Sequence, residues 1–169
     1  MDLDALKTEI DKIKLIKDKL NILINKFNKI IIIGNGGSNA IASHITVDYT
    51  KFLNKQALSF SDAPRLTAYI NDYGRDEAYK QFVWDYTNTN IDNSEILVIL
   101  ISSSGNSMNI INSAKYCENN SITYIALSGF SKNNKLNNMN ANFKYWVNAK
   151  SYGVVECAHE ILLHSIVKN

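Results

Sequence analysis

Two short apolar runs, each ended by small residues, constrain the fold of this chain most strongly. Residues 29–33 and 95–101 are rich in isoleucine, leucine and valine. The first run stops at the glycine-rich loop 34–38, and the second stops at the serine-rich loop 102–107. Apolar runs of this length, bounded by such loops, are typical of strands buried on both faces of a sheet. Both runs therefore predict interior strands.

Helix and strand patterns alternate through the rest of the chain. Helices are predicted over residues 2–28, from 38 or 39 to 52, over 62–70, 76–87 and 107–119, and from near Glu156 to 167. Further strands are predicted over 56–60, 122–127 and 143–147. The asparagine-rich segment 131–142 is predicted to be either a surface loop or a short helix. This alternation implies an α/β fold of three layers, in which helices cover both faces of a parallel five-stranded sheet.

The first predicted helix carries a stripe of apolar residues spaced by three and four. The stripe comprises Leu3, Leu6, Ile10, Ile13, Leu20, Ile24 and Phe27. Such a stripe can pack against the helix's own domain. A narrow seam of this kind also suits packing against another subunit. The pattern leaves both interpretations open.

Topology brings the two unusual loops together. Ligands of open parallel sheets bind at the carboxyl ends of the strands, where the strand order reverses. If the order is 2-1-3-4-5, the first and third strands are neighbours at that reversal. We therefore expect loop 34–38 and loop 102–107 to lie side by side.

The serine-rich loop has the chemistry of an anion site. The start of a helix leaves backbone N–H groups unpaired, and its dipole favours a negative charge. Serine hydroxyls add donors, and Gly105 lets the backbone turn tightly. The alternative is that these residues merely form a turn and a helix cap. Loop 34–38 lacks the third glycine of a dinucleotide site and the Gly-Lys-Ser/Thr ending of a P-loop.

Composition excludes other classes of function. The formal net charge of +2 argues against a nucleic-acid partner, which selects for a strong basic patch. Cys117 and Cys157 lack a tight spacing, so we expect a reduced, cytoplasmic protein. The first residues lack the apolar core of a signal peptide, and no apolar run is long enough to span a bilayer, so we expect no membrane partner.

Several pieces of the sequence, taken together, resemble one family. They are Gly-Asn-Gly-Gly-Ser at 34–38, Ser-Ser-Ser-Gly-Asn-Ser at 102–107, His44 with Asp48, Asn-Asp-Tyr-Gly at 71–74, and the segment 156–164. In this order, and over nearly the whole chain, they resemble the sugar isomerase, or SIS, domain, and most of all its phosphoheptose isomerases. The resemblance implies a flavodoxin-like, doubly wound sheet with an added N-terminal helix.

The same resemblance implies an activity and an assembly. It implies an aldose–ketose isomerase that converts sedoheptulose 7-phosphate into D-glycero-D-manno-heptose 7-phosphate by proton transfer between C1 and C2. The pathway implied is heptose biosynthesis for bacterial surface polysaccharide. Residues 1–169 would form a single SIS domain, with 1–28 as an oligomerisation helix. The implied assembly is a homotetramer with active sites between subunits.

By position, the resemblance also assigns site residues. Those implied to bind substrate are Asn35, Gly36, Gly37, Ser38, Asp72, Ser102, Ser103, Ser104 and Ser107, with the serines on the phosphate. Those implied to bind metal are His44, Asp48, Glu156 and His164, with zinc as the cofactor, one ion per subunit. Asp48, Glu156 and His164 are also the implied catalytic residues.

These residue types suit the implied reaction. Moving a carbonyl between C1 and C2 needs a base for a carbon-bound proton and an acid for the oxygens, and a metal ion can polarise the carbonyl. His44 and Asp48 are four apart and share a helix face, but they could equally be a solvated pair. Glu156 and His164 are about two turns apart. Glu160, on the same stripe, is a rival carboxylate.

Two residues depart from the pattern of the family. The family usually has glutamate at the position of Asp48 and glutamine at the position of Glu156. Aspartate is one methylene shorter, and misplacing a base by about 1 Å can cost roughly a hundredfold in rate. Our hypothesis is that Glu156 offsets this change by binding metal or by acting as the base. The departures also keep two alternatives open: an isomerase of another sugar phosphate, and a non-catalytic SIS protein like the DnaA initiator-associating protein.

Overall fold

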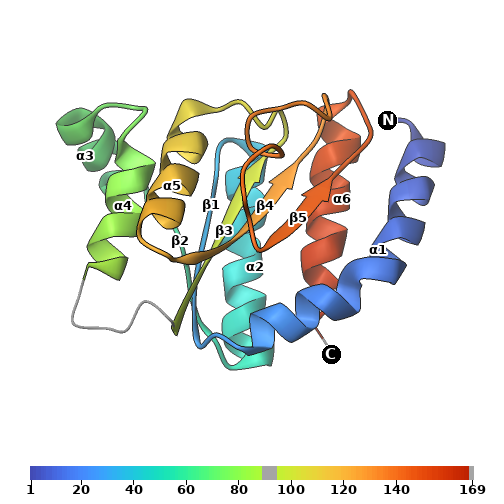
Figure 1. The fold of residues 1–169 in the computed structure, drawn as a ribbon, viewed down its shortest axis with the longest axis horizontal. Coiled ribbons are helices and arrows are strands. Elements are labelled where there is room, and N and C mark those ends of the chain that lie inside the picture. The colour runs from blue at the N-terminus through green and yellow to red at the C-terminus, as the bar shows by residue number, and fades with distance from the viewer. Residues whose placement is uncertain (89–94, 168–169) are drawn as a thin grey trace.

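The computed structural model describes residues 1–88 and 95–167. Figure 1 shows its helices and strands around a central sheet. The helices are α1 (Leu3–Asn25), α2 (Gly37–Leu53), α3 (Ala63–Tyr73), α4 (Ala78–Thr87), α5 (Met108–Asn119) and α6 (Tyr152–His164). The strands are β1 (Lys29–Gly34), β2 (Gln56–Ser59), β3 (Ile96–Ser102), β4 (Thr123–Ser128) and β5 (Phe143–Trp146).

The sheet has the order β2-β1-β3-β4-β5, and every neighbouring pair is parallel. This confirms the predicted order and the flavodoxin-like, doubly wound fold. The order reverses between β1 and β3, where Gly34 is in register with Ile101. Both strands therefore end at the same level, and the loops that follow them start side by side.

Side chains of β3 alternate between two hydrophobic cores, because successive residues of a strand point to opposite faces. Leu97, Ile99 and Ile101 pack in the core that α1, α2 and α6 cover. Val98 and Leu100 pack in the core that α4 and α5 cover. Every residue of β3 is buried, which confirms the interior position predicted from its continuous apolar run.

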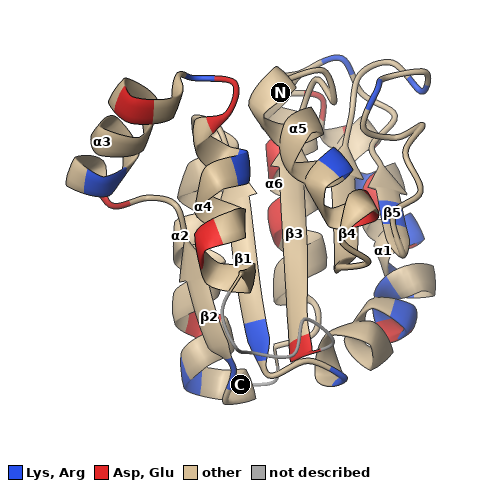
Figure 2. Ribbon diagram, turned by 60° about the vertical axis from the view of Figure 1, so that its left-hand side comes forward, with Lys and Arg blue, Asp and Glu red and all other residues tan. Residues whose placement is uncertain are grey.

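Helix α3 lies at the margin of the core that α4 and α5 cover, where its partly buried Leu66 and Tyr69 pack. None of its residues is buried, and it packs beside α4 rather than on the sheet. Figure 2 shows it projecting beyond α4.

Helix α1 packs against its own domain. Ile13, Leu20 and Ile24 are buried in the core that α2 and α6 share. Of the two interpretations left open, packing within the domain is therefore confirmed for these residues. Leu15 and Ile22 lie on the outer side, with 81% and 63% of their surface exposed. An apolar outer face thus remains on the same helix.

The structure corrects several predicted boundaries. The N-cap of helix α2 is Gly36, not Ser38 or Asn39. The chain enters the helix through a φ of 52° at this residue, a conformation that favours glycine. Helix α3 continues through residues 71–73 and ends at Gly74, whose φ is 77°. Helix α6 begins at Tyr152, one turn before the predicted start. Residues 131–142 form turns and bends without a helix, which is the first of the two predicted alternatives.

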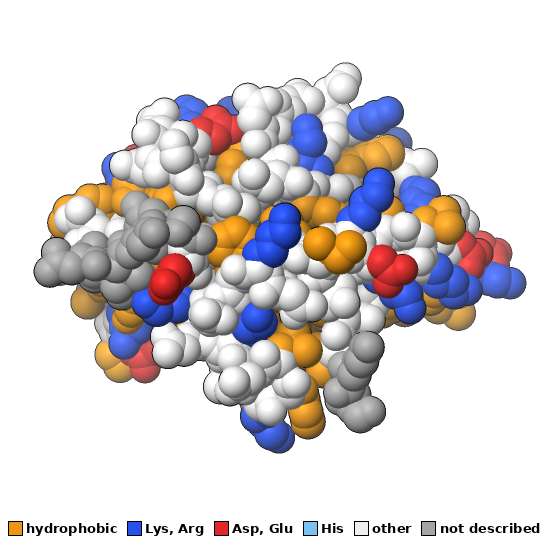
Figure 3. All heavy atoms as spheres, turned by 60° about the horizontal axis from the view of Figure 1, so that its bottom comes forward, with side chains coloured by type: hydrophobic (Ala, Val, Ile, Leu, Met, Phe, Trp, Pro, Cys, Tyr) orange, Lys and Arg blue, Asp and Glu red, His pale blue; other side chains and the backbone are white. Residues whose placement is uncertain are grey.

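The end of the sheet at which the strands begin faces the viewer in Figure 3. Basic side chains are scattered over this face among uncharged and hydrophobic ones. Among the described residues, no helix combines the length and the apolar character needed to cross a membrane.

His159 lies in the core under α6 and generates a testable pH dependence. It is fully buried, its Nε2 lies 3.1 Å from the carbonyl oxygen of Ser128, and burial lowers its pKa to about 4. In the unfolded chain His159 is protonated as the pH falls through about 6.5, whereas in the folded chain it stays neutral until about pH 4. The free energy of unfolding should therefore fall by up to about 3 kcal/mol between pH 6.5 and pH 4.

Urea unfolding across this pH range measures the effect. His159→Gln should remove this part of the acid destabilisation, whereas His44→Gln, at an exposed histidine, should keep it. Identical pH slopes in the wild type and His159→Gln would contradict the assignment.

Candidate active site

A pocket of about 240 Å³ opens where β1 and β3 end. It is lined by Asn35, Gly36, Gly37, Ser38, Ser102, Ser103, Ser104, Ser107, Tyr152 and Glu156. The structure thus brings the glycine-rich and serine-rich loops into one cavity. Of the residues assigned to substrate by resemblance, all but Asp72 line it.

One hydroxyl group of the serine loop is not used by the fold itself. Ser107, the N-cap of α5, makes no capping hydrogen bond with its side chain, but its hydroxyl accepts a hydrogen bond from Ser102 Oγ, at 3.4 Å. The Ser103 hydroxyl is buried and has no hydrogen-bond partner in the described part of the chain. A buried polar group without a partner is costly, so a ligand oxygen would stabilise it. A simple turn and cap leaves the Ser103 hydroxyl unexplained.

The glycine loop allows α2 and α6 to approach closely. A Cβ built on Gly37 would lie 2.5 Å from both carboxylate oxygens of Glu156, so a larger residue at this position would displace that carboxylate. Asn35 exchanges two amide hydrogen bonds with Asn109 of α5, at 3.0 and 2.8 Å. These bonds fasten the glycine loop to the helix that follows the serine loop.

Glu156 is the acidic residue of the pocket. Burial disfavours its charged form and raises its pKa above the ordinary carboxyl value. A carboxyl group with a raised pKa, facing a cavity, is suited to exchange a proton with a ligand.

A second group of titratable residues lies farther along the same two helices. His44 and Asp48 come from α2 and His164 comes from the end of α6, and ligand atoms of the three lie within 4.8 Å of one another. Asp48 Oδ2 lies 3.2 Å from His164 Nδ1 and 3.8 Å from His44 Nε2. The two imidazole rings are 5.1 Å apart, between centroids. The site can therefore form a metal centre or an acid–base pair.

The structure separates the two carboxylates that the sequence left as rivals. Glu160 Oε1 lies 3.8 Å from His164 Nε2, whereas Asp48 approaches the other ring nitrogen, Nδ1. Glu156 is absent from the cluster of His44, Asp48 and His164, and faces the pocket instead. Three of the four predicted metal ligands are thus brought together, and Glu156 is not brought to them.

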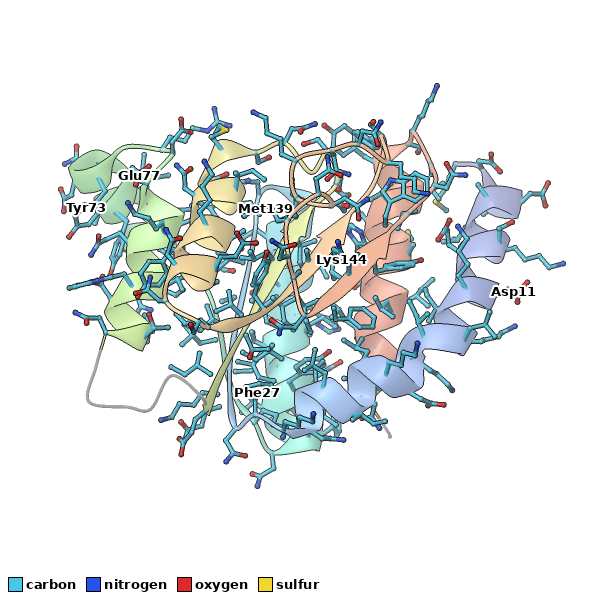
Figure 4. All side chains as sticks on the ribbon, viewed as in Figure 1. Asp11, Phe27, Tyr73, Glu77, Met139 and Lys144 are labelled. Carbon is cyan, nitrogen blue, oxygen red and sulfur yellow. The ribbon has the colours of Figure 1, made fainter. Side chains whose placement is uncertain are left out.

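Asp72 lies outside the pocket. It is exposed near the end of α3, where its Oδ1 accepts a hydrogen bond from the Asn71 amide. Figure 4 places the neighbouring Tyr73 at the outer edge of the molecule, across from α6. Within one chain, the structure does not bring Asp72 to the other predicted residues.

Two residues of the site were not predicted. Tyr152 lines the pocket from the first turn of α6. Asn109 holds Asn35 from α5. Tyr152 lies one helical turn before Glu156 and so on the same side of α6, but the predicted helix began too late to include it. No local sequence pattern marks Asn109, because its partner lies 74 positions away.

Comparison with known proteins identifies the family of this chain. A family model described as SIS domain matches residues 3–129. The phosphoheptose isomerase of Fusobacterium nucleatum is 29% identical over 158 residues, which cover 90% of this chain and 78% of that protein. The phosphoheptose isomerase of Helicobacter pylori is 31% identical, over 75% of this chain and 68% of that protein.

A solved structure supports the fold. The phosphoheptose isomerase of Neisseria gonorrhoeae superposes with a TM-score of 0.82 at 23% identity, covering 97% of this chain and 89% of that one. The family model spans more than half of the chain, and the Helicobacter relative is matched over two thirds of its length. The chain therefore belongs to the SIS domain family and, within it, to the phosphoheptose isomerases.

Proposed function

We propose that this chain is an aldose–ketose isomerase that converts sedoheptulose 7-phosphate into D-glycero-D-manno-heptose 7-phosphate. The observation that carries the proposal is the pairing of a pocket lined by the serine-rich loop with a cluster of His and Asp residues on α2 and α6, the two helices that complete the pocket. The names of the relatives support the substrate. Heptose biosynthesis for surface polysaccharide, in the cytoplasm, belongs to the same proposal.

In this proposal the serine loop binds the phosphate. Ser102, Ser103, Ser104 and Ser107 line the pocket at the start of α5, whose unpaired N–H groups favour an anion. The orphaned hydroxyl of Ser103 would gain a phosphate oxygen as partner. Asn35, Gly36, Gly37 and Ser38 would contact the adjoining part of the sugar.

The spacing of the two groups favours a long sugar phosphate. Ser38 lines the pocket, and His44 lies six residues farther along α2, or about 9 Å of helix. Glu156 and His164 are eight residues apart on α6, or about 12 Å. The phosphate and the reacting carbons of the substrate must therefore be well separated. C7 and the C1–C2 pair of a heptulose 7-phosphate meet this requirement.

The cluster supplies the groups that isomerisation needs. Asp48, whose side chain is only 16% exposed, would take the proton from carbon and return it to the neighbouring carbon. His164, with Nδ1 3.2 Å from Asp48, would hold the proton that moves between the oxygens. Pocket-lining Glu156 would exchange a proton with a sugar hydroxyl.

The same cluster fits a zinc ion. Two imidazoles and a carboxylate within 4.8 Å of one another match the nitrogen and oxygen donors that zinc binds in catalytic sites. As the alternative to the Asp48–His164 acid–base pair, His44, Asp48 and His164 would hold the ion, and a bound zinc would polarise the substrate carbonyl.

Incubating the purified protein with sedoheptulose 7-phosphate, with and without zinc, tests the proposed function. NMR should show the aldose heptose 7-phosphate, and Asp48→Asn should lower kcat by at least about a hundredfold, because it removes the base. Asp18→Asn, at a solvent-exposed position of α1, is the matched control and should keep full activity. If the wild type converts no substrate under either condition, the two alternatives are favoured: an isomerase of another sugar phosphate, or a non-catalytic SIS protein.

Replacing Glu156 by glutamine tests its separate role. The variant should lose activity but bind zinc as tightly as the wild type, because Glu156 lies outside the cluster. The acid limb of the wild-type pH–rate profile should begin above the ordinary carboxyl pKa, because the pKa of Glu156 is raised, and this limb should move in the variant. Isothermal titration with zinc and steady-state kinetics measure both. Weakened zinc binding by the variant would instead show that Glu156 is a metal ligand.

The proposal includes assembly through α1. Leu15 and Ile22 expose apolar surface on this helix, and Val47 and Phe52 do so on α2. We infer that a homotetramer covers such surface, with α1 as an oligomerisation helix of a single SIS domain.

Light scattering after size-exclusion chromatography checks the assembly. The wild type should have the mass of a tetramer. The double variant Leu15→Lys, Ile22→Lys should have a lower mass, because burying charge at an interface is costly. Trp84→Lys, at an exposed apolar residue of α4, should leave the mass unchanged. A monomeric wild type would contradict the proposed assembly.

A further inference from the structure

The tip of the serine loop is held from outside by a neighbouring loop. Gly105, at the tip, has a φ of 63° and donates its N–H to Ser102. Its carbonyl oxygen accepts a hydrogen bond from the N–H of Leu136, at 2.9 Å. The N–H of Lys135 donates to Asn106 Oδ1, at 3.1 Å. Residues 134–136, from the loop between β4 and β5, thus bind both residues at the tip.

Asn134 is the centre of this contact. It is 1% exposed, and its amide nitrogen lies within hydrogen-bond distance of Ser128 Oγ and of the carbonyl oxygens of Gly129 and Ser131, at 3.2, 3.1 and 2.8 Å. Its Oδ1 accepts a hydrogen bond from the Asn137 N–H, at 2.8 Å. Because the nitrogen faces oxygens and the oxygen faces an N–H, the orientation of the amide is fixed.

The fixed amide lies directly against Gly105. A Cβ built on Gly105 would lie 2.0 Å from Asn134 Oδ1 and 2.2 Å from its Cγ. The space that a side chain would need at the loop tip is therefore filled by Asn134. The asparagine does not line the pocket itself, so any effect on a ligand must act through the loop.

The other end of the neighbouring loop is also fastened to the sheet. Lys144 of β5 donates from Nζ to the carbonyl oxygens of Asn137 and Met139, both at 3.2 Å. Figure 4 labels Met139 and Lys144 on the side of the molecule where this loop crosses the strands. Leu136 is fully buried in the core that α4 and α5 cover. The loop is therefore a rigid support for residues 105 and 106.

We propose that Asn134 is a positioning residue that sets the geometry of the phosphate-binding serine loop. The inference rests on the proposed function of that loop. Hydroxyl and N–H donors bind an anion tightly when they are held in place before it arrives, because binding then costs less ordering. Asn134 and the backbone of residues 135 and 136 provide that order, so that Ser102–Ser104 point into the pocket without the ligand.

Two variants break the contact from its two sides. Asn134→Ala removes the amide that packs on Gly105. Asn106→Ala removes the acceptor of the Lys135 N–H and also the hydrogen bond from Asn106 Nδ2 to the carbonyl oxygen of Ser104, and its exposed position means that folding should not depend on it. Asn133→Ala is the matched control, since this neighbouring asparagine is exposed and its side chain makes none of these bonds.

Binding of inorganic phosphate, followed by ³¹P NMR titration, is the first measurement. Both variants should weaken the binding about tenfold, and the double variant should be little worse than either, because both act on one loop tip. Asn133→Ala should bind as the wild type does. If circular dichroism shows that Asn134→Ala does not fold, the phosphate affinity of Asn106→Ala alone tests the inference.

Kinetics with sedoheptulose 7-phosphate separates positioning from a general loss of structure. Both variants should raise KM by a similar factor and leave kcat within about twofold. Wild-type binding of phosphate together with unchanged binding in the folded variants would overturn the inference and leave the proposed function intact. A wild type that binds no phosphate would overturn both, and an equal fall in kcat would show a structural role instead.

Discussion

The parallel pairing of β1 with β3 is the constraint on which the rest of the structure depends. It places Gly34 beside Ile101, so that two loops far apart in the sequence begin at the same level of the sheet. The strands are fixed there because their side chains fill both cores. Each buried aliphatic side chain contributes roughly 1.5–3 kcal/mol by leaving water. A rigid sheet edge of this kind gives the loops a defined separation, which a phosphate site requires.

Helices α2 and α6 hold the proposed acid–base residues, which lie farther from that edge of the sheet. Gly37 and Glu156 bring the two helices together at the pocket, and Asp48 and His164 meet farther along. The fully buried Tyr49 donates its hydroxyl to the carbonyl oxygen of Leu163, which ties the helices together near the cluster. The acid–base residues and one side of the pocket therefore belong to the same pair of helices.

The sequence indicated much of this arrangement, because the features involved are local. The apolar run of β3 and the serines after it predict a buried strand and an anion site, and both loops do line one pocket. The contacts that organise the pocket are not local. Asn35 with Asn109 and Asn134 with Gly105 join distant segments, and no periodic pattern marks them. The roles of Glu156 and Glu160 were likewise undecided, because both lie on one stripe of α6 and only packing against α2 tells them apart.

The most direct test of this layout is a crystal structure of Asp48→Ala with sedoheptulose 7-phosphate bound. The variant lacks the proposed base, so the substrate should stay intact. The phosphate should lie among Ser102, Ser103, Ser104 and Ser107, and C1 and C2 should lie beside His164. A phosphate bound outside the serine loop, or a sugar whose C1–C2 end points away from His44 and His164, would contradict the account.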